Sequence, residues 1–163
     1  MSSLPLTPEA VAALSPESLL DLENQLCFAV YSASHAFNRA YKPLLKKLGL
    51  TYPQYLVMMV LWEEDAATVT AIGERLRLDS GTLTPLLKRM ETAGVVERRR
   101  DSADERQVRI YLTAAGRELR QAAVDVPRTL LCAIGGEMQE FQQLRSSLQA
   151  LSGRLEQMAD TLR

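Results

Sequence analysis

Two cysteines, Cys27 and Cys132, are the side chains in this sequence with the greatest capacity for covalent chemistry. A thiol attacks as its thiolate, whereas a thiol in plain apolar surroundings stays protonated and inert. Cys27 lies in the stretch LENQLCFAVYSASHAF, residues 22–37, which is largely apolar and typical of a helix. The stretch alone leaves two interpretations open: a small core side chain, or a thiol that reacts.

The number and spacing of the cysteines argue against other kinds of chemistry. Two cysteines, one histidine and no CxxC pair provide no framework for a metal site, so we expect no metal and no cofactor. The first basic residue is Arg39, and no apolar run approaches the roughly 18 residues of a membrane span. We therefore expect no secretory signal, no membrane contact and a cytoplasmic location, where reducing conditions keep both thiols free.

The charged residues are unevenly distributed along the chain. The composition, 47% apolar and 24% charged with a formal net charge of -1, is that of an ordinary globular domain. Residues 1–30 carry four acidic residues and no basic one, whereas residues 75–109 carry nine Lys or Arg against six acidic residues. A near-neutral protein can bind a polyanion through one basic segment if that segment forms a single surface.

The N-terminal third predicts an arm followed by a long helix. Residues 1–14 are rich in Pro, Ser and Ala and predict a flexible arm. The tripeptide Ser-Pro-Glu at 15–17 is typical of a helix start. Apolar residues then recur every three or four positions, so we expect one long helix over 15–50, bent near Pro43 and ended by Gly49. These apolar positions are Leu19, Leu22, Leu26, Val30, Ala33 and Phe37.

The middle of the chain predicts a helix-turn-helix. After a buried helix over 51–62, residues 70–76 predict a short helix, and Leu78-Asp79 a turn. Asp79 or Ser80 caps a second helix that continues to about Ala93. The inner face of this second helix consists of Leu83, Leu86, Leu87 and Met90. Its outer face, with short polar side chains for base edges and cations for phosphates, consists of Ser80, Thr82, Thr84, Pro85, Lys88 and Arg89.

A basic β-hairpin is predicted directly after the helix-turn-helix. Residues 95–100 and 107–112 alternate as strands do, and the segment between them is a charged turn. Asp104 is expected to pair with Arg106 and to hold its guanidinium toward a nucleic acid. Residues 51–112 therefore predict a winged-helix DNA-binding domain. The arginines of the hairpin are Arg98, Arg99, Arg100, Arg106 and Arg109.

The C-terminal residues, 113–163, predict helices that pair two copies of the chain. One helix begins at Thr113 and continues past Pro127 to about Cys132, and a break follows at Gly135-Gly136. The last helix carries a nearly heptad-like apolar stripe to the chain end, which favours packing against a partner. The predicted fold is mainly α with a small β-hairpin: a winged helix-turn-helix that forms a homodimer through its N- and C-terminal helices. Two winged helices related by a two-fold axis predict an inverted-repeat DNA site with half-sites ~10 bp apart.

Two stretches resemble a known family of regulators. DSGTLTPLLKRMETAGVVERRRDSADERQVRIYLTAAGREL resembles the recognition helix and wing of the MarR family of dimeric winged-helix regulators, including the Asp-x-Arg turn at Asp104 and Arg106. LENQLCFAVY is similar to the first-helix stretch of one branch of that family, the organic hydroperoxide sensors of OhrR type. The resemblance extends from about Leu22 to Leu162.

The resemblance implies roles for both cysteines. In that branch the cysteine matching Cys27 is attacked by organic hydroperoxides, and tyrosines matching Tyr41 and Tyr52 hydrogen-bond its sulfur across the dimer interface. In a two-cysteine subgroup a second cysteine, which matches Cys132, forms an intersubunit disulfide with the oxidised thiol. Apolar side chains such as Phe28, Val30 and Phe37 would then favour an apolar hydroperoxide over hydrogen peroxide.

The expected function is that of a repressor that binds an inverted-repeat operator as a homodimer and releases it when Cys27 is oxidised. Three alternatives remain open at the level of sequence. One is a MarR-type repressor relieved by a non-covalent aromatic ligand, and another is a thiol peroxidase, although we expect a regulator and not an enzyme. The third is an adaptor with no role at DNA, which a steep salt dependence of DNA binding would exclude.

Overall fold

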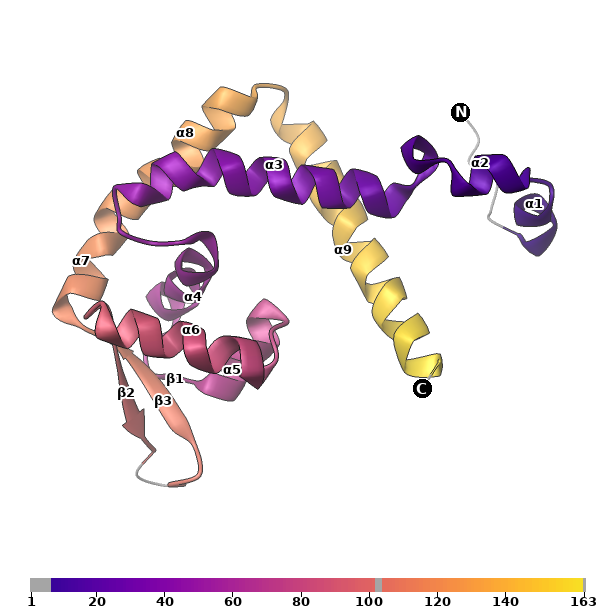
Figure 1. Cartoon of the computed structure of the whole chain (residues 1–163). Coiled ribbons are helices and arrows are strands. Elements are labelled where there is room, and N and C mark those ends of the chain that lie inside the picture. Colours follow the sequence, from indigo (N-terminus) through magenta and orange to yellow (C-terminus); the bar gives the residue numbers. More distant parts are fainter. Residues whose placement is uncertain (1–6, 102–103, 163) are drawn as a thin grey trace. The chain divides into compact units, whose positions relative to one another are not determined.

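The computed structural model of this chain describes residues 7–101 and 104–162 (Figure 1). It forms two compact units, Met1–Val126 and Pro127–Arg163, which we describe separately. The helices are α1 (Pro8–Ala12), α2 (Pro16–Leu20), the 3-10 helix η1 (Leu22–Asn24), α3 (Leu26–Lys46), α4 (Tyr52–Glu63), α5 (Val69–Leu76), α6 (Ser80–Thr92), α7 (Ala114–Ala123), α8 (Asp125–Ile134) and α9 (Met138–Thr161). The strands are β1 (Ala67–Thr68), β2 (Val96–Arg100) and β3 (Val108–Leu112).

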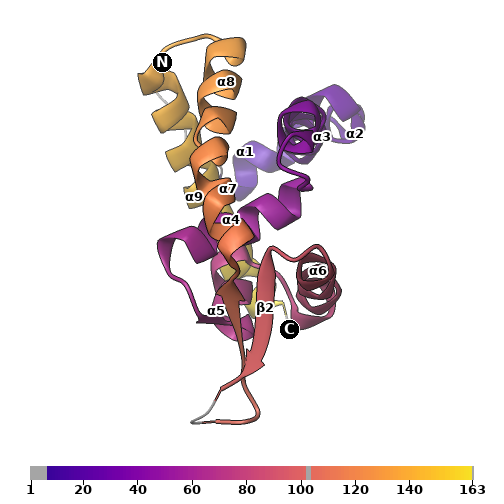
Figure 2. The ribbon, with the colours of Figure 1, turned by 90° about the vertical axis from the view of Figure 1, so that its left-hand side faces the viewer.

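The first unit is organised around a three-stranded antiparallel sheet and the helices that pack on it. The strand order is β1-β3-β2, with Val96 opposite Leu112 and Arg100 opposite Val108. Figure 2 shows the β2–β3 hairpin extending beyond the helices beside α6. The sequence predicted this hairpin but not β1, which has only two residues. The core of the unit is formed by side chains that include Val57, Met58, Leu61, Ile72, Leu83, Leu87, Met90 and Ile110.

The predicted helix-turn-helix is confirmed. Thr51 and Gln54 form a capping box at the start of α4, and α4 continues to Glu63 as the sequence indicated. Helix α6 begins after Asp79, and all four residues of its predicted inner face are buried. The helical periodicity was decisive here because each predicted core position meets an apolar neighbour.

The predicted single helix over 15–50 is wrong, because the chain leaves the helical conformation between α2 and α3. Asp21 and Gln25 are both extended, with ψ of 123° and 113°. The Asp21 carboxylate accepts a hydrogen bond from the Glu23 backbone N–H at 3.1 Å, which offers the backbone an alternative to the helical hydrogen bond. Helix α3 then continues through Pro43 to Lys46, and Gly49 follows with a φ of 67°.

Two further expectations about the chain ends require comment. Of the predicted arm, residues 1–14, residues 1–6 lie outside the described part, and residues 8–12 form α1, which Thr7 caps. The helix predicted from Thr113 to Cys132 is divided into α7 and α8 at Val124. Pro127 has no N–H to donate to the carbonyl four residues earlier, so the break falls before the proline and not at it.

The described residues of the second unit form two helical segments, from α8 and α9. The predicted break at Gly135-Gly136 separates them. Gly135 and Gly136 have φ values of 70° and 87°, which glycine adopts without strain and which separate α8 from α9. No residue of α9 is buried among the described residues. Most of its apolar stripe is exposed in the single chain, and only Phe141 and Leu151 of the stripe are half-buried.

Gly116 provides a test of how α7 is held against the sheet. A Cβ atom at this position would lie 2.1 Å from the Val95 carbonyl oxygen, and the Gly116 carbonyl accepts a hydrogen bond from the Trp62 indole at 2.9 Å. Gly116→Ala should therefore lower the free energy of unfolding by about 2 kcal/mol or more, because backbone must move. Urea denaturation measures this loss. Ala115→Ser, at an exposed neighbouring position, should change it by less than about 0.5 kcal/mol; equal effects would contradict the packing.

Candidate redox centre and nucleic-acid interface

The turn before α6 fixes the orientation of that helix. Arg77 ends α5 with a φ of 54°, and the Leu78 N–H donates to the Gly73 carbonyl at 2.9 Å. Asp79 caps α6 by accepting hydrogen bonds from the backbone N–H and the hydroxyl of Thr82, each at 2.9 Å. These bonds, the backbone bond first, lower the pKa of Asp79, so its carboxylate remains charged at the positive end of the helix.

The outer face of α6 is largely open to solvent, as predicted. Thr84 alone among the six predicted contact residues is half-buried. Lys88 and Arg89 have no ion pair with another described residue, so their charges are available to an external anion. A face of small polar side chains beside two cations matches the needs of a helix in the major groove. The five exposed residues are Ser80, Thr82, Pro85, Lys88 and Arg89.

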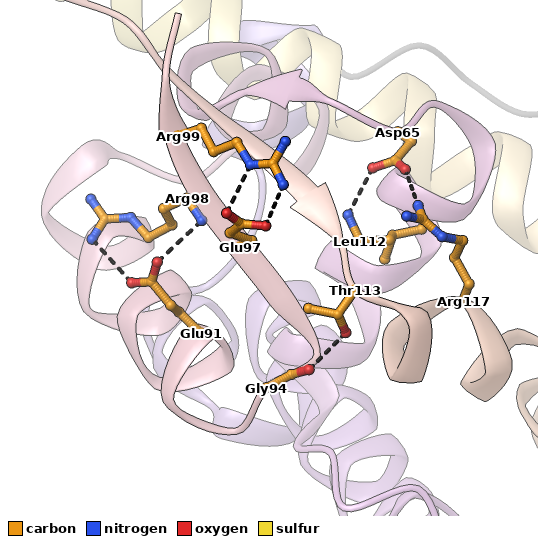
Figure 3. Close-up of polar contacts among 9 residues, drawn as sticks. All are labelled: Asp65, Glu91, Gly94, Glu97, Arg98, Arg99, Leu112, Thr113 and Arg117. Atoms are coloured by element: carbon orange, nitrogen blue, oxygen red, sulfur yellow. Dashed lines mark hydrogen bonds and ion pairs between the residues drawn. The ribbon is translucent and has the colours of Figure 1, made fainter.

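Arg98 and Arg99 of β2 point to opposite sides of the strand (Figure 3). The Arg98 backbone N–H donates to the Glu91 carboxylate of α6 at 3.1 Å, and its guanidinium lies 3.7 Å from the same carboxylate. The Arg99 guanidinium donates to Glu97 at 2.8 and 2.6 Å and lies 4.9 Å from the centre of the Tyr111 ring. Since neighbouring side chains alternate along a strand, Arg98 connects the wing to α6, while Arg99 lies on the other face.

The predicted pair at the tip of the wing is present. Asp104 accepts hydrogen bonds from the backbone N–H and the Nε of Arg106, each at 3.1 Å, and a further one from Gln107 at 3.3 Å. These bonds, the one from the Arg106 side chain first, lower the pKa of Asp104. The Arg106 side chain is nevertheless 91% exposed, so a guanidinium fixed at one end extends into solvent. Arg100, at the end of β2, is also exposed.

Two acidic residues that were not predicted to have this role connect the wing to the rest of the first unit. Asp101 is nearly buried and accepts a hydrogen bond from Arg109, whose guanidinium also donates to the Ala66 carbonyl at 3.0 Å. Asp65 accepts from the Leu112 backbone N–H at 2.8 Å and from Arg117 at 2.6 Å (Figure 3). Arg109 therefore acts within the fold. Three of these four contacts join residues more than 40 positions apart, and local periodicity does not predict such pairs.

Both thiols are free and exposed in the single chain. Cys27 is the second residue of α3 and belongs to the first unit, whereas Cys132 lies in α8, in the second unit. Exposure argues against the interpretation of Cys27 as core filler. The expected apolar wall around it is exposed as well, with exposed fractions of 37–44% for Phe28, Val30 and Phe37.

The tyrosines predicted to serve Cys27 lie together at the other end of α3. The ring centres of Tyr41 and Tyr52 are 4.6 Å apart, and Tyr55, which sequence reasoning missed, lies 6.2 Å from Tyr41. Burial raises the pKa of all three phenols, so each remains a protonated donor at neutral pH. Cys27 and Tyr41 are 14 positions apart on one helix, which separates them by about 21 Å along its axis.

The described residues provide neither a metal site nor a membrane span. No three His, Cys, Asp or Glu side chains among them are grouped so that they could hold a metal ion. Within the same residues, no helix is long and apolar enough to cross a membrane.

Comparison with known proteins identifies the fold and the type of protein. A family profile for the transcriptional regulators SarA/Rot matches residues 39–123. The chain is 49% identical over 138 residues to the organic hydroperoxide resistance transcriptional regulator of Bacillus subtilis, a match that covers 85% of this chain and 94% of the relative.

Solved structures agree with this assignment. Reduced AbfR bound to DNA is 38% identical, with a TM-score of 0.78 over 88% of this chain and 99% of that one. Disulfide-formed AbfR is 41% identical, with a TM-score of 0.62 over 83% and 95%. The chain belongs to the MarR family. It is a DNA-binding transcriptional regulator of the hydroperoxide resistance type and not an enzyme, which confirms the winged-helix prediction.

The tyrosine cluster predicts a late step in an alkaline titration. Burial in the folded protein favours the neutral phenols. The contribution of these phenols to folding stability is therefore fully present below pH 10.0, and it is lost as the pH rises through their raised pKa values. Tyr52→Phe should remove one late phenol and also lower the pKa of Tyr41, which the Tyr52 charge otherwise raises. Absorbance of the ionised phenols measures both changes. Tyr31→Phe, outside the cluster, should leave the late step unchanged. Loss of the late step in this variant would contradict its assignment to the cluster.

Proposed function

We propose that this regulator binds an inverted-repeat operator as a homodimer and releases it when an organic hydroperoxide oxidises Cys27. The observation that carries the proposal is an exposed thiol in the first turn of α3, surrounded by exposed apolar side chains. The backbone N–H groups of a first turn have no intrahelical acceptors, and the positive end of the helix favours an anionic sulfur. The reducing conditions that keep such a thiol free fit a cytoplasmic location.

DNA binding follows from α6 and the wing. The outer face of α6 enters the major groove, with Lys88 and Arg89 on phosphates. At the tip of the wing Arg106, positioned by Asp104, reaches the backbone or the adjacent minor groove. Arg98, Arg99 and Arg100 add positive charge to the wing, although the first two are engaged with glutamates of the chain.

A two-fold dimer explains the exposed apolar surface of both ends of the chain. In the first unit the exposed side chains include Leu19, Leu20, Leu22, Leu26, Phe28, Val30, Tyr31 and Phe37. In the second they include Leu131, Ile134, Met138, Leu144, Leu148, Leu155, Met158 and Leu162. Surfaces of this size on a monomer mark sites of association, and a two-fold partner covers both in the same way.

The second subunit also completes the sensor. Since Cys27 lies about 21 Å from Tyr41 of its own chain, the phenols that donate to the sulfur are Tyr41 and Tyr52 of the partner subunit. The thiolate attacks one peroxide oxygen, so that an S–O bond forms as the O–O bond breaks. The sulfur is oxidised to sulfenic acid, and the peroxide is reduced and leaves as the alcohol after taking up a proton.

Cys132 then reacts with the oxidised Cys27 of the other subunit. Its thiolate displaces hydroxide from the sulfenic acid, which forms a disulfide and, after protonation, water. Bringing the two sulfurs together moves the helices that set the spacing between the two winged helices. A change of a few ångströms between half-sites is enough to lose the fit to both grooves at once.

Single cysteine variants test the redox proposal. Reduced wild-type protein, bound to DNA selected from a random pool, should release it after treatment with tert-butyl hydroperoxide and give a dimer-sized band on a non-reducing gel. Cys27→Ser should stay bound and give no band, and Cys132→Ser should give no band. Unchanged DNA affinity of the oxidised wild type would overturn the proposal. Release of Cys27→Ser by the treatment would instead favour a non-covalent ligand.

Variants of the wing test the DNA proposal. Arg106→Ala should weaken operator binding about tenfold and reduce the slope of log affinity against log salt by about 1, because one exposed phosphate contact is lost. Arg99→Ala should have an effect of less than about threefold, since Glu97 already pairs with that guanidinium. Fluorescence anisotropy over a range of salt concentrations measures both. If Arg99→Ala weakened operator binding more than Arg106→Ala, the proposed ranking of the two contacts would be wrong.

A further inference from the structure

The charges around α3 are separated along the chain. Glu17, Asp21 and Glu23 precede the helix, and no acidic residue follows until Glu63. The bases of this region all lie at the other end, at Arg39, Lys42, Lys46 and Lys47. We refer to residues 17–23 as the acidic segment. Over residues 20–23 of this segment, apolar side chains alternate with carboxylates, and Leu20 and Leu22 are 86% and 55% exposed.

A pocket at the basic end of α3 has the complementary chemistry. It lies between the C-terminal half of α3 and the start of α4 and has a volume of about 510 Å³. We call it the lysine pocket, and its lining includes Lys42, Leu45, Lys46, Leu50, Tyr52 and Pro53. Both lysines are exposed and have no ion pair with another described residue. The pocket therefore offers apolar contact with positive charge beside it.

The acidic segment of a chain cannot reach the lysine pocket of the same chain. Helix α3 is continuous from Leu26 to Lys46, which places Lys42 about 24 Å along the axis from the first turn. The occupant with the matching pattern is thus a second copy of the chain.

We propose that the acidic segment of each subunit docks on the lysine pocket of the other. The proposal rests on the two-fold dimer in which Cys27 meets Tyr41 of the partner subunit. In such an antiparallel pair, a step toward the N-terminus on one helix matches a step toward the C-terminus on the other. Moving back from Cys27 past the start of α3 therefore leads beyond Tyr41 of the partner subunit, toward Lys46 of the partner subunit at the end of that helix.

This register brings opposite charges and apolar side chains together. Glu23 approaches Lys46 of the partner subunit, while Leu22 and Leu20 reach the apolar lining of that pocket. The Glu23 side chain has no hydrogen bond or ion pair with another described residue, so its charge is available for this pairing. The docked segment would also cover Tyr52 and keep water from the sulfur–phenol contacts.

Charge reversal tests the docking. Glu23→Lys and Lys46→Glu should each weaken the reduced dimer about tenfold at low salt, since each occurs twice per dimer, and the double variant should return to within about threefold of wild type. Analytical ultracentrifugation measures the dissociation constants. Glu64→Lys, with the same change of net charge at an exposed site after α4, should have no such effect. Additive losses in the double variant would overturn the proposal.

A cross-link tests the register directly. In a Cys27→Ser, Cys132→Ser background, Glu23→Cys with Lys46→Cys should give an intersubunit disulfide on mild oxidation, and Glu64→Cys with Lys46→Cys should not. Absence of the first cross-link, or equal yields, would overturn the register. Peroxide-induced DNA release by the wild type tests the proposed function separately. If peroxide releases the DNA but the double charge variant does not regain dimer affinity, the docking proposal alone is wrong. If the double variant regains dimer affinity but peroxide does not release the DNA, the sensing proposal alone is wrong.

Discussion

The length of one continuous helix is the constraint on which the rest of the proposed sensor depends. Helix α3 begins one residue before Cys27 and ends beyond Tyr41, so the thiol and the phenol cluster are fixed at opposite ends of a rod. A sensor built from these groups must therefore be assembled from two chains. The same rod separates the acidic segment from the lysines. Geometry and charge thus favour the same antiparallel pairing.

Helix α4 connects this rod to the DNA-reading parts. It packs against α3, α5, α6 and α7, and Tyr55, Val57, Met58, Val60 and Leu61 are buried in it. A helix covered on most sides cannot absorb a displacement of one neighbour by sliding, because interiors are close-packed. Under the proposed function, a shift of α3 would therefore reach α6 through α4 as a movement of the winged helix.

The sequence determined the regular parts of the fold and less of the site. Periodicity predicted α6 with its buried and exposed faces, because each apolar position there contacts the core. It failed at residues 21–25, where the Asp21 carboxylate and the Gln25 side chain compete with the helix for backbone groups. The sequence pattern also predicted Arg98 and Arg99 as DNA contacts without distinguishing between them. Only the pairing with Glu91 and Glu97 shows that each already has a partner within the chain.

The contacts between the wing and the rest of the first unit bear on how a winged helix would respond to a small displacement under the proposed function. Arg109 joins Asp101 to the Ala66 carbonyl, and Asp65 joins β3 to α7, so β3 is fixed to the rest of the first unit at two points along its length. Glu91 fixes the same hairpin to α6. Helix and wing therefore move as one piece, and neither can adjust alone to recover its groove when the spacing between subunits changes. Under the proposed function, this rigid attachment would convert a local change at the Cys27 sulfur into release of both half-sites.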